Sequence, residues 1–141
     1  MIFQDFLDNG KVRKGNPDIS LSKSMVNMSL NHSKTAKSIK LDDTTCSTVF
    51  TLYYEALREI CEAICSLEGY KVYSHEAFTY FLKDYLNEEH ISNKFDRLRL
   101  NRNRINYYGK TVSLNESKSM IKTAVEIIKL LKEKYIIGKL Q

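Results

Sequence analysis

The residues best suited to chemistry lie in one short stretch, Asp96–Lys110, with the sequence DRLRLNRNRINYYGK. On a helix, at about 100° per residue, Arg99, Arg102 and Asn106 would lie within about 60° of one another. The polar side chains that accompany them on this helix are Asn103, Arg104 and Tyr107. Guanidinium groups can hold a phosphate through paired hydrogen bonds, amides can orient a phosphate or a base edge, and a phenol can stack on a base. The stretch is therefore typical of a site that binds RNA or a nucleotide.

The positive charge of the chain is concentrated in the same place. The formal net charge is +5 at pH 7. Residues 94–110 contain six basic residues and a single acidic one, so this segment carries +5 and the rest of the chain sums to zero. A neutral scaffold with one basic segment indicates an anionic partner such as RNA or a nucleotide. The alternative is a solvated basic helix whose arginines pair with acids of neighbouring helices.

Composition places the chain among ordinary globular proteins, with 141 residues, 43% of them hydrophobic and 28% charged. That length suits one domain. No apolar run reaches about 18 residues, so we expect no membrane-spanning helix and no membrane contact. The first residues contain acids and lack the basic and apolar regions of a signal peptide. Three cysteines, an odd number without a sign of secretion, favour a cytoplasmic protein rather than a disulfide framework.

The cysteines and histidines do not indicate a metal site. Cys61 and Cys65 share one helix face, but no cluster of His or acidic residues completes a tetrahedral ligand set around them. We expect these two side chains to act as small apolar packing groups. His75 is expected to have a packing role, and His32 is expected to face solvent. The sequence thus predicts neither a metal nor a cofactor.

Apolar residues at helical spacing predict a series of helices joined by short connections. The expected helices span about residues 18–41, 47–67, 74–86, 92–108 and 113–135. Asp18 or Ser20 is expected to cap the first helix, and Ser113 with Glu116 forms a capping box at the last. The second helix is apolar on more than one side, which predicts a central position. We expect an all-α fold without a sheet, an antiparallel up-and-down bundle of four to five helices.

This organisation predicts three segments along the chain. Residues 1–17 are expected to form an N-terminal arm that docks weakly or onto a partner, since Gly10, Gly15 and Pro17 interrupt any regular pattern. Residues 18–137 would form the bundle, and residues 138–141 a C-terminal tail.

The order of these elements resembles the HEPN domain (higher eukaryotes and prokaryotes nucleotide-binding), especially its small prokaryotic members, over about residues 19–137. Residues 53–78 are similar to the family's second helix, its glycine stop and its Ser-His-Glu-Ala entry to the third helix. In residues 98–110, Arg102 and Asn103 match the first half of the family's motif, an Arg often followed by Asn, a short spacer and a His. The His would fall at Tyr107, so this chain departs from the second half of the motif.

The resemblance implies a function at this motif. In HEPN ribonucleases, Arg and His of two subunits face each other across a dimer cleft and cleave RNA without a metal. A His suits proton transfer because its pKa lies near neutrality, whereas Tyr, with an ordinary pKa of about 10, is a poor general base at pH 7. We therefore expect a degenerate nuclease motif in a nucleotide- or RNA-binding protein. The expected binding residues are Arg99, Arg102, Asn103, Arg104 and Asn106.

The resemblance also implies partners and leaves alternatives open. Many small HEPN proteins form homodimers and are encoded beside a minimal nucleotidyltransferase, as toxin–antitoxin pairs. In some pairs the partner adenylylates a Tyr two places after the His, which here is Gly109, so the adjacent Tyr107 and Tyr108 become the candidates for modification. One alternative is a metal-independent endoribonuclease toxin with Arg102 and Tyr107 as catalytic residues. The other is a helical adaptor without nucleic-acid contact.

Overall fold

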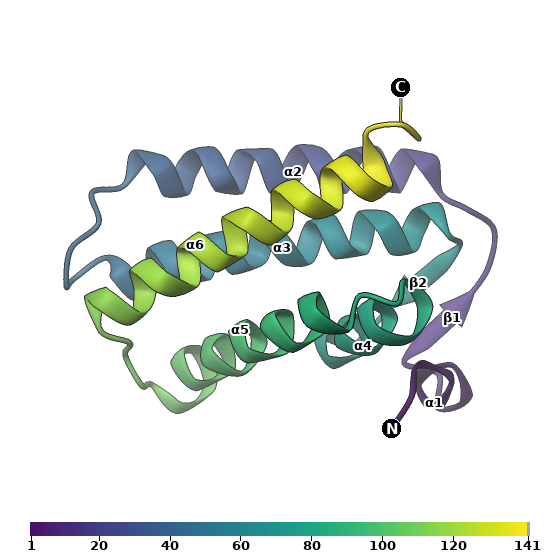
Figure 1. Cartoon of the computed structure of the whole chain (residues 1–141), viewed down its shortest axis with the longest axis horizontal. Coiled ribbons are helices and arrows are strands. Elements are labelled where there is room, and N and C mark those ends of the chain that lie inside the picture. The colour runs from purple at the N-terminus through teal and green to yellow at the C-terminus, as the bar shows by residue number, and fades with distance from the viewer. Residues whose placement is uncertain (141) are drawn as a thin grey trace.

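The computed structural model describes residues 1–140, and helices make up most of this range. The elements are α1 (Phe3–Asp8), β1 (Val12–Lys14), α2 (Ile19–Ser38), α3 (Cys46–Leu67), β2 (Tyr70–Val72), α4 (His75–Tyr80), α5 (Glu89–Tyr108) and α6 (Leu114–Leu131). A π-helical turn continues α4 over Phe81–Tyr85, and another continues α6 over Lys132–Ile136. The all-α bundle is confirmed (Figure 1), with six α-helices in the described range because the N-terminal segment contributes α1.

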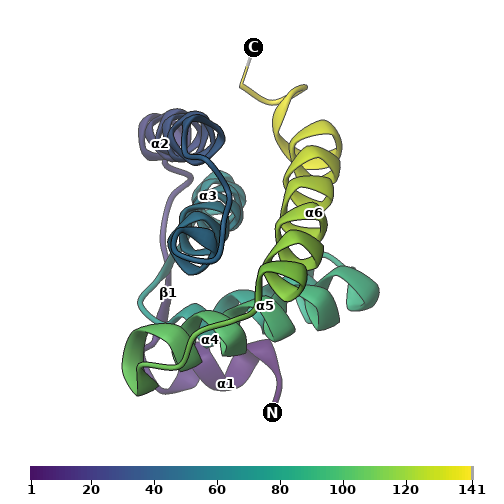
Figure 2. The same cartoon turned by 90° about the vertical axis from the view of Figure 1, so that its left-hand side faces the viewer.

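Helix α3 lies at the centre of the bundle, as the sequence predicts. Viewed end-on, it lies between α2, α6 and α5 (Figure 2). Its apolar side chains cover several sides of the helix because neighbours pack on each of those sides. The largest of its fully buried apolar side chains are Phe50, Tyr54, Leu57, Ile60 and Ile64. This packing on several sides holds α3 in place, and α3 is the helix that faces the arginines of α5.

A small antiparallel sheet corrects the expectation of a fold without strands. Val12 of β1 lies opposite Val72 of β2. Each strand has only three residues, too few to show an alternating pattern in the sequence. Beyond the strands, the Gly15 N–H donates to the Gly69 carbonyl at 2.7 Å. Gly69 has φ +83°, and a Cβ there would lie 2.4 Å from the Gly15 oxygen, so this close approach requires glycine.

The N-terminal segment is part of the folded body, so the expectation of a weakly docked arm is wrong. Phe3 and Phe6 are 6% and 1% exposed. The Phe3 ring packs edge-on against Tyr70 and Phe81. The Phe3 N–H also donates to the Asp84 carboxylate at 2.7 Å. Burial of two aromatic rings holds α1 on the bundle. The glycines that follow α1 in the sequence led to the expectation of an irregular arm.

The predicted caps of α2 and α6 are confirmed. The Asp18 carboxylate accepts the Leu21 N–H at 2.9 Å, and the Ser113 hydroxyl accepts the Glu116 N–H at 3.1 Å. Helix α5, however, begins at Glu89 instead of after Ser92. The Ser92 hydroxyl is buried and donates to the Glu89 carbonyl inside the first turn, so it is not a cap.

Candidate functional site

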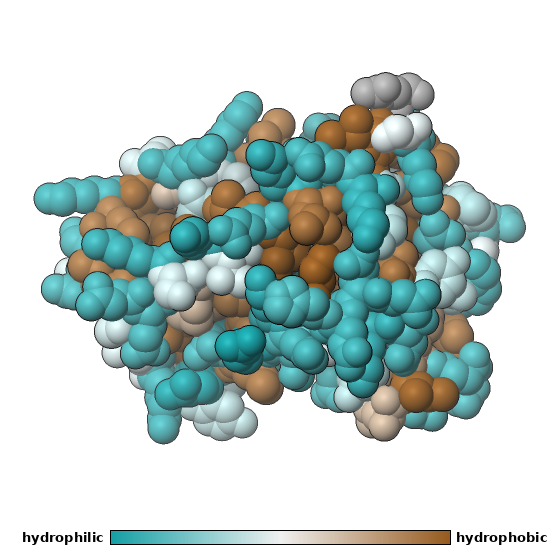
Figure 3. Space-filling model, viewed as in Figure 1, coloured by the Kyte–Doolittle hydropathy of each residue, from teal (hydrophilic) through white to brown (hydrophobic). Residues whose placement is uncertain are grey.

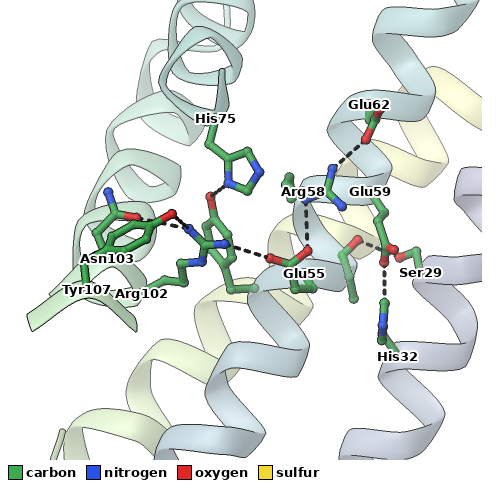
Figure 4. A network of polar contacts seen from close by, with 12 residues as sticks. Ser29, His32, Glu55, Arg58, Glu59, Glu62, His75, Arg102, Asn103 and Tyr107 are labelled. Carbon is green, nitrogen blue, oxygen red and sulfur yellow. Dashed lines mark hydrogen bonds and ion pairs between the residues drawn. The ribbon is translucent and has the colours of Figure 1, made fainter. Parts of the chain in front are cut away.

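Arg102 is held between α5 and α3 by several partners at once (Figure 4). Its Nη2 lies 3.6 Å from Glu55 Oε1 on α3. Its Nη1 donates to Asn103 Oδ1 at 3.2 Å and to the Tyr107 hydroxyl at 3.4 Å. The guanidinium carbon is 5.6 Å from the ring centroids of both Tyr54 and Tyr107, which are cation–π distances. The structure therefore brings together three of the predicted site residues, Arg102, Asn103 and Tyr107.

The Arg102 side chain is mostly buried and not fully satisfied. It is 14% exposed, and its Nε has no hydrogen-bond partner among residues 1–140. Leaving a buried donor unpaired costs about 1–3 kcal/mol, so this guanidinium has capacity for one more acceptor. Tyr107, at 68% exposure, lies against one side of the guanidinium.

Carboxylates on α3 offset the positive charge of this cluster. Arg58 donates through Nε to Glu55 at 3.0 Å and through Nη1 to Glu62 at 2.5 Å. Glu55 thus lies between two guanidinium groups, those of Arg58 and Arg102. The spacing of these α3 residues, three and four apart, places them on one helix face.

Arg99 is paired on its own helix rather than with Arg102. Its Nη2 and Nε lie 2.9 and 3.0 Å from Asp96 Oδ1, which also accepts the Thr79 hydroxyl at 2.9 Å. The side chain of Arg99 is 12% exposed. Arg99 therefore pairs with Asp96, and Arg102 with Glu55. This arrangement agrees with the alternative given above, a basic helix whose arginines pair with nearby acids. Arg99 and Arg102 do not form one open phosphate cleft.

His75, at the start of α4, joins the cluster through Tyr54. Its Nδ1 is 3.2 Å from the Tyr54 hydroxyl (Figure 4). Burial, followed by the positive charges of Arg58 and Arg102, lowers the pKa of His75 to about 4. Burial also raises the pKa of the Tyr54 phenol. The cluster consequently contains an uncharged imidazole at neutral pH. No local signal links residues 21 apart, so sequence reasoning did not connect this pair.

A second group of basic side chains lies on the outer side of α5. Residues at helical spacing form a stripe within about 80° of one another, here called the outer stripe. Its members are Lys94, Arg97, Asn101, Arg104 and Tyr108. The amide of Asn101 donates to the Arg97 carbonyl at 3.0 Å and accepts from Arg104 at 3.4 Å. Arg97 and Arg104 are exposed, and Tyr108 is 72% exposed.

The outer stripe differs from the Arg102 cluster because its charges lack acidic partners. Across residues 1–140, no ion pair involves Lys94, Arg97 or Arg104. A cavity of about 340 Å³ between α5 and α6 borders the stripe. Its lining includes Lys94, Arg97, Asn101, Glu116, Ser119 and Thr123. This surface can take an anion without breaking an existing pair.

The remaining predicted site residues fall in different places. Arg104 and Tyr108 belong to the outer stripe. Asn106 lines a separate depression of about 220 Å³ next to Ser47 and Thr51 of α3. The sequence pattern thus identified the helix correctly as the basic element, but its polar residues are distributed over three sides of that helix.

A hydrogen-bonded pair, His32 and Glu59, lies behind the cluster, on the other side of α3 (Figure 4). His32 Nδ1 is 2.7 Å from Glu59 Oε1, and the Glu59 side chain is 0% exposed. The His32 side chain is 33% exposed, so it faces solvent only in part and its Nδ1 faces Glu59 instead. Glu59 Oε2 has no partner among residues 1–140, and burial raises the pKa of this carboxyl.

The surface in the view of Figure 3 is mostly hydrophilic. Figure 3 shows hydrophilic side chains over most of the viewed side, with hydrophobic patches between them. No helix within residues 1–140 has the length and hydropathy needed to cross a membrane. In the same range, no group of three His, Cys, Asp or Glu residues is placed to hold a metal ion.

The fold and the site together define an all-α bundle with a cationic outer stripe and a partly neutralised arginine cluster on α5. Comparisons with protein-family models, with curated proteins and with solved structures found no match for this chain.

Proposed function

We propose that this protein is a HEPN-like protein that binds RNA or a nucleotide through α5 and carries a degenerate nuclease motif. The observation that supports this most strongly is the outer stripe, in which Lys94, Arg97 and Arg104 have no acidic partner in the described range. Cations of this kind gain free energy when they replace the counterions of a nucleic acid. The resemblance of residues 98–110 to the HEPN motif points to the same helix.

Each part of α5 has a distinct role in this proposal. Arg97 and Arg104 hold phosphates through paired hydrogen bonds. Asn101, anchored to the Arg97 carbonyl, orients the Arg104 guanidinium through its amide oxygen. Tyr108, exposed at the last turn of α5, stacks on a base. Arg102 is a second anion site that becomes accessible when Tyr107 moves.

The test is the salt dependence of RNA binding. Fluorescence anisotropy of a labelled 12-nucleotide oligouridine is measured between 50 and 200 mM salt. Single-stranded binding has a log–log slope of about −0.7 per neutralised phosphate, so three stripe cations give about −2. The double variant Arg97→Ala/Arg104→Ala should reduce the slope to about −0.7.

The matched control is Lys118→Ala/Lys122→Ala, which removes the same charge from exposed positions of α6. It should leave affinity within about twofold and the slope within about 0.3 of wild type, since exposed charges away from the ligand are screened. An equal loss in both double variants, or no RNA binding by the wild type, contradicts the proposal. The second result would favour the adaptor without nucleic-acid contact.

The proposal includes a homodimer and a nucleotidyltransferase partner, which rest on the resemblance, and a cytoplasmic location, which rests on the odd number of cysteines. Modification of Tyr107 or Tyr108 is supported by their exposure of 68% and 72%. Light scattering of the purified protein tests the dimer through its mass. Mass spectrometry after incubation with ATP and a minimal nucleotidyltransferase tests the modification, and replacement of both tyrosines by phenylalanine is the control.

A second candidate function is a metal-independent endoribonuclease, and His75 is the observation that favours it. The imidazole is neutral at pH 7 and lies one hydrogen bond from Tyr54, whose ring contacts Arg102. It would supply the proton acceptor that α5 lacks, while Arg102 would stabilise the phosphate in the transition state. Cleavage of RNA in excess chelator, lost in Arg102→Ala and in His75→Ala, would support this function. No cleavage by the wild type would contradict it.

A further inference from the structure

The two-stranded ribbon formed by β1 and β2 presents a second cationic surface, outside α5. Side chains alternate along a strand, so Lys11, Arg13, Lys71 and Tyr73 share the outer face of the ribbon, whereas Val12 and its opposite neighbour turn inward. All four outer side chains are exposed. This set, here called the ribbon face, contains three cations, one aromatic ring and no acid.

The charge arrangement on the ribbon face is unfavourable in the protein alone. Arg13 lies directly opposite Lys71 in the strand register. Like charges at directly opposed positions destabilise a sheet. In the described part of the chain neither side chain takes part in an ion pair. An anion bound between them would remove the repulsion.

Two of the acidic residues near the strands, Asp18 and Glu68, are occupied elsewhere. Asp18 accepts the Leu21 N–H as the cap of α2. The Glu68 carboxylate binds Lys139 at 3.2 Å and accepts the Tyr85 hydroxyl at 3.0 Å. Neither carboxylate is available to neutralise the ribbon face.

Tyr73 gives this surface a means of holding a base. Its ring is 56% exposed, and its centroid lies 5.6 Å from the Arg13 guanidinium and 6.0 Å from Lys71 Nζ. A depression of about 260 Å³ beside it is lined partly by Gly15, Asn16, Ser66 and Gly69. Small-molecule sites measure roughly 300–1,000 Å³, so this depression suits one segment of a polymer better than a whole ligand.

We propose that the ribbon face binds a segment of single-stranded nucleic acid, with a phosphate between Arg13 and Lys71 and a base on Tyr73. Cations that track a backbone beside an exposed aromatic ring are the usual elements of such binding. The single ring, without aliphatic side chains on the same face, argues against insertion into a lipid surface. The inference rests on the proposed function only for the class of ligand, because its residues lie outside α5.

The test measures the anisotropy of a labelled 18-nucleotide oligouridine at 100 mM salt. We expect Arg13→Ala/Lys71→Ala to weaken binding about tenfold and Tyr73→Ala about fivefold, whereas Tyr73→Phe retains the ring and stays near wild type. Lys118→Ala/Lys122→Ala is again the charge-matched control. The ribbon double variant should keep or raise the melting temperature, since it removes a like-charge pair.

The possible results separate this inference from the proposed function. An affinity loss in the ribbon double variant no larger than in the control overturns the ribbon inference, as does unchanged binding by Tyr73→Ala. If only Arg97→Ala/Arg104→Ala weakens binding, the ribbon inference fails and the α5 proposal stands. If only the ribbon variants weaken binding, the α5 proposal fails and the ribbon inference stands. Absence of RNA binding by the wild type, or ribbon-dependent binding to anionic vesicles alone, overturns the inference.

Discussion

Replacement of Glu59 by leucine should stabilise the protein at neutral pH. Glu59 is fully buried in α3, with one carboxylate oxygen bonded to His32 at 2.7 Å and the other without a partner among residues 1–140. Burying an ionised carboxylate costs several kcal/mol of folding free energy, and a hydrogen bond to one partner offsets only part of this cost. Leucine has a similar size and needs no partner, and His32, at 33% exposure, can turn to water.

The expected gain follows from these opposing contributions. The variant loses a hydrogen bond to a charged group, worth about 1.5–3 kcal/mol, and removes an unpaired oxygen that costs about 1–3 kcal/mol. It also removes the desolvation of the carboxylate and buries an apolar side chain. Replacements of buried charged groups by apolar ones range from neutral to about 4 kcal/mol more stable, and we expect about 1–3 kcal/mol here.

The gain should depend on pH in a defined direction. Burial raises the pKa of Glu59 in the folded protein, so the folded state holds this proton more tightly than the unfolded chain does. Wild-type stability therefore falls as the pH rises from the ordinary carboxyl pKa of about 4.3 through the raised value. Leucine cannot titrate, so the difference between variant and wild type should be smallest near pH 4 and largest above the raised pKa.

Urea denaturation followed by circular dichroism at pH 4.5, 6 and 8 measures this difference. The control is Glu126→Leu at an exposed position of α6, where we expect a change within about 0.5 kcal/mol. A Glu59→Leu protein that is less stable than wild type at pH 8 would refute the reasoning. So would a gain of the same size at all three pH values.

Three further predictions concern the backbone, the site and a helix cap. Gly69→Ala should lower the free energy of unfolding by about 1–3 kcal/mol, because φ is +83° and the added Cβ would lie 2.4 Å from a backbone oxygen. Gly10→Ala is the control, since Gly10 has φ +80° but open space around it, and it should lower the free energy of unfolding by less in the same urea titration. NMR should show His75 uncharged down to about pH 4, and wild-type stability should fall as pH decreases from about 6.5 towards that value, a slope that His75→Gln removes. A normal His75 titration near pH 6.5 would contradict this. Ser113→Ala should cost about 1 kcal/mol in thermal unfolding because the Glu116 N–H loses its acceptor, and an unchanged melting temperature would contradict the cap.

Helix α5 shows how far sequence reasoning reaches. Its basic composition identified the charged element correctly, since composition does not depend on neighbours. The expected grouping of Arg99, Arg102 and Asn106 was not found as a common site, because Asp96 and Glu55 each take one arginine. A helical wheel gives angles about one axis, but it does not identify the neighbouring helix or its acids.

The sequence by itself determined the five helices after residue 17 and the caps at Asp18 and Ser113, because these depend on interactions within about one turn of the chain. It also determined the central place of α3, whose apolar residues cover more sides than one neighbour could bury. Tertiary structure alone decided the ribbon and the pairs Tyr54–His75 and Glu59–His32, which join residues 21 and 27 positions apart. Such contacts arise from the packing of whole elements against α3, and the short-range pattern along the chain carries no signal for them.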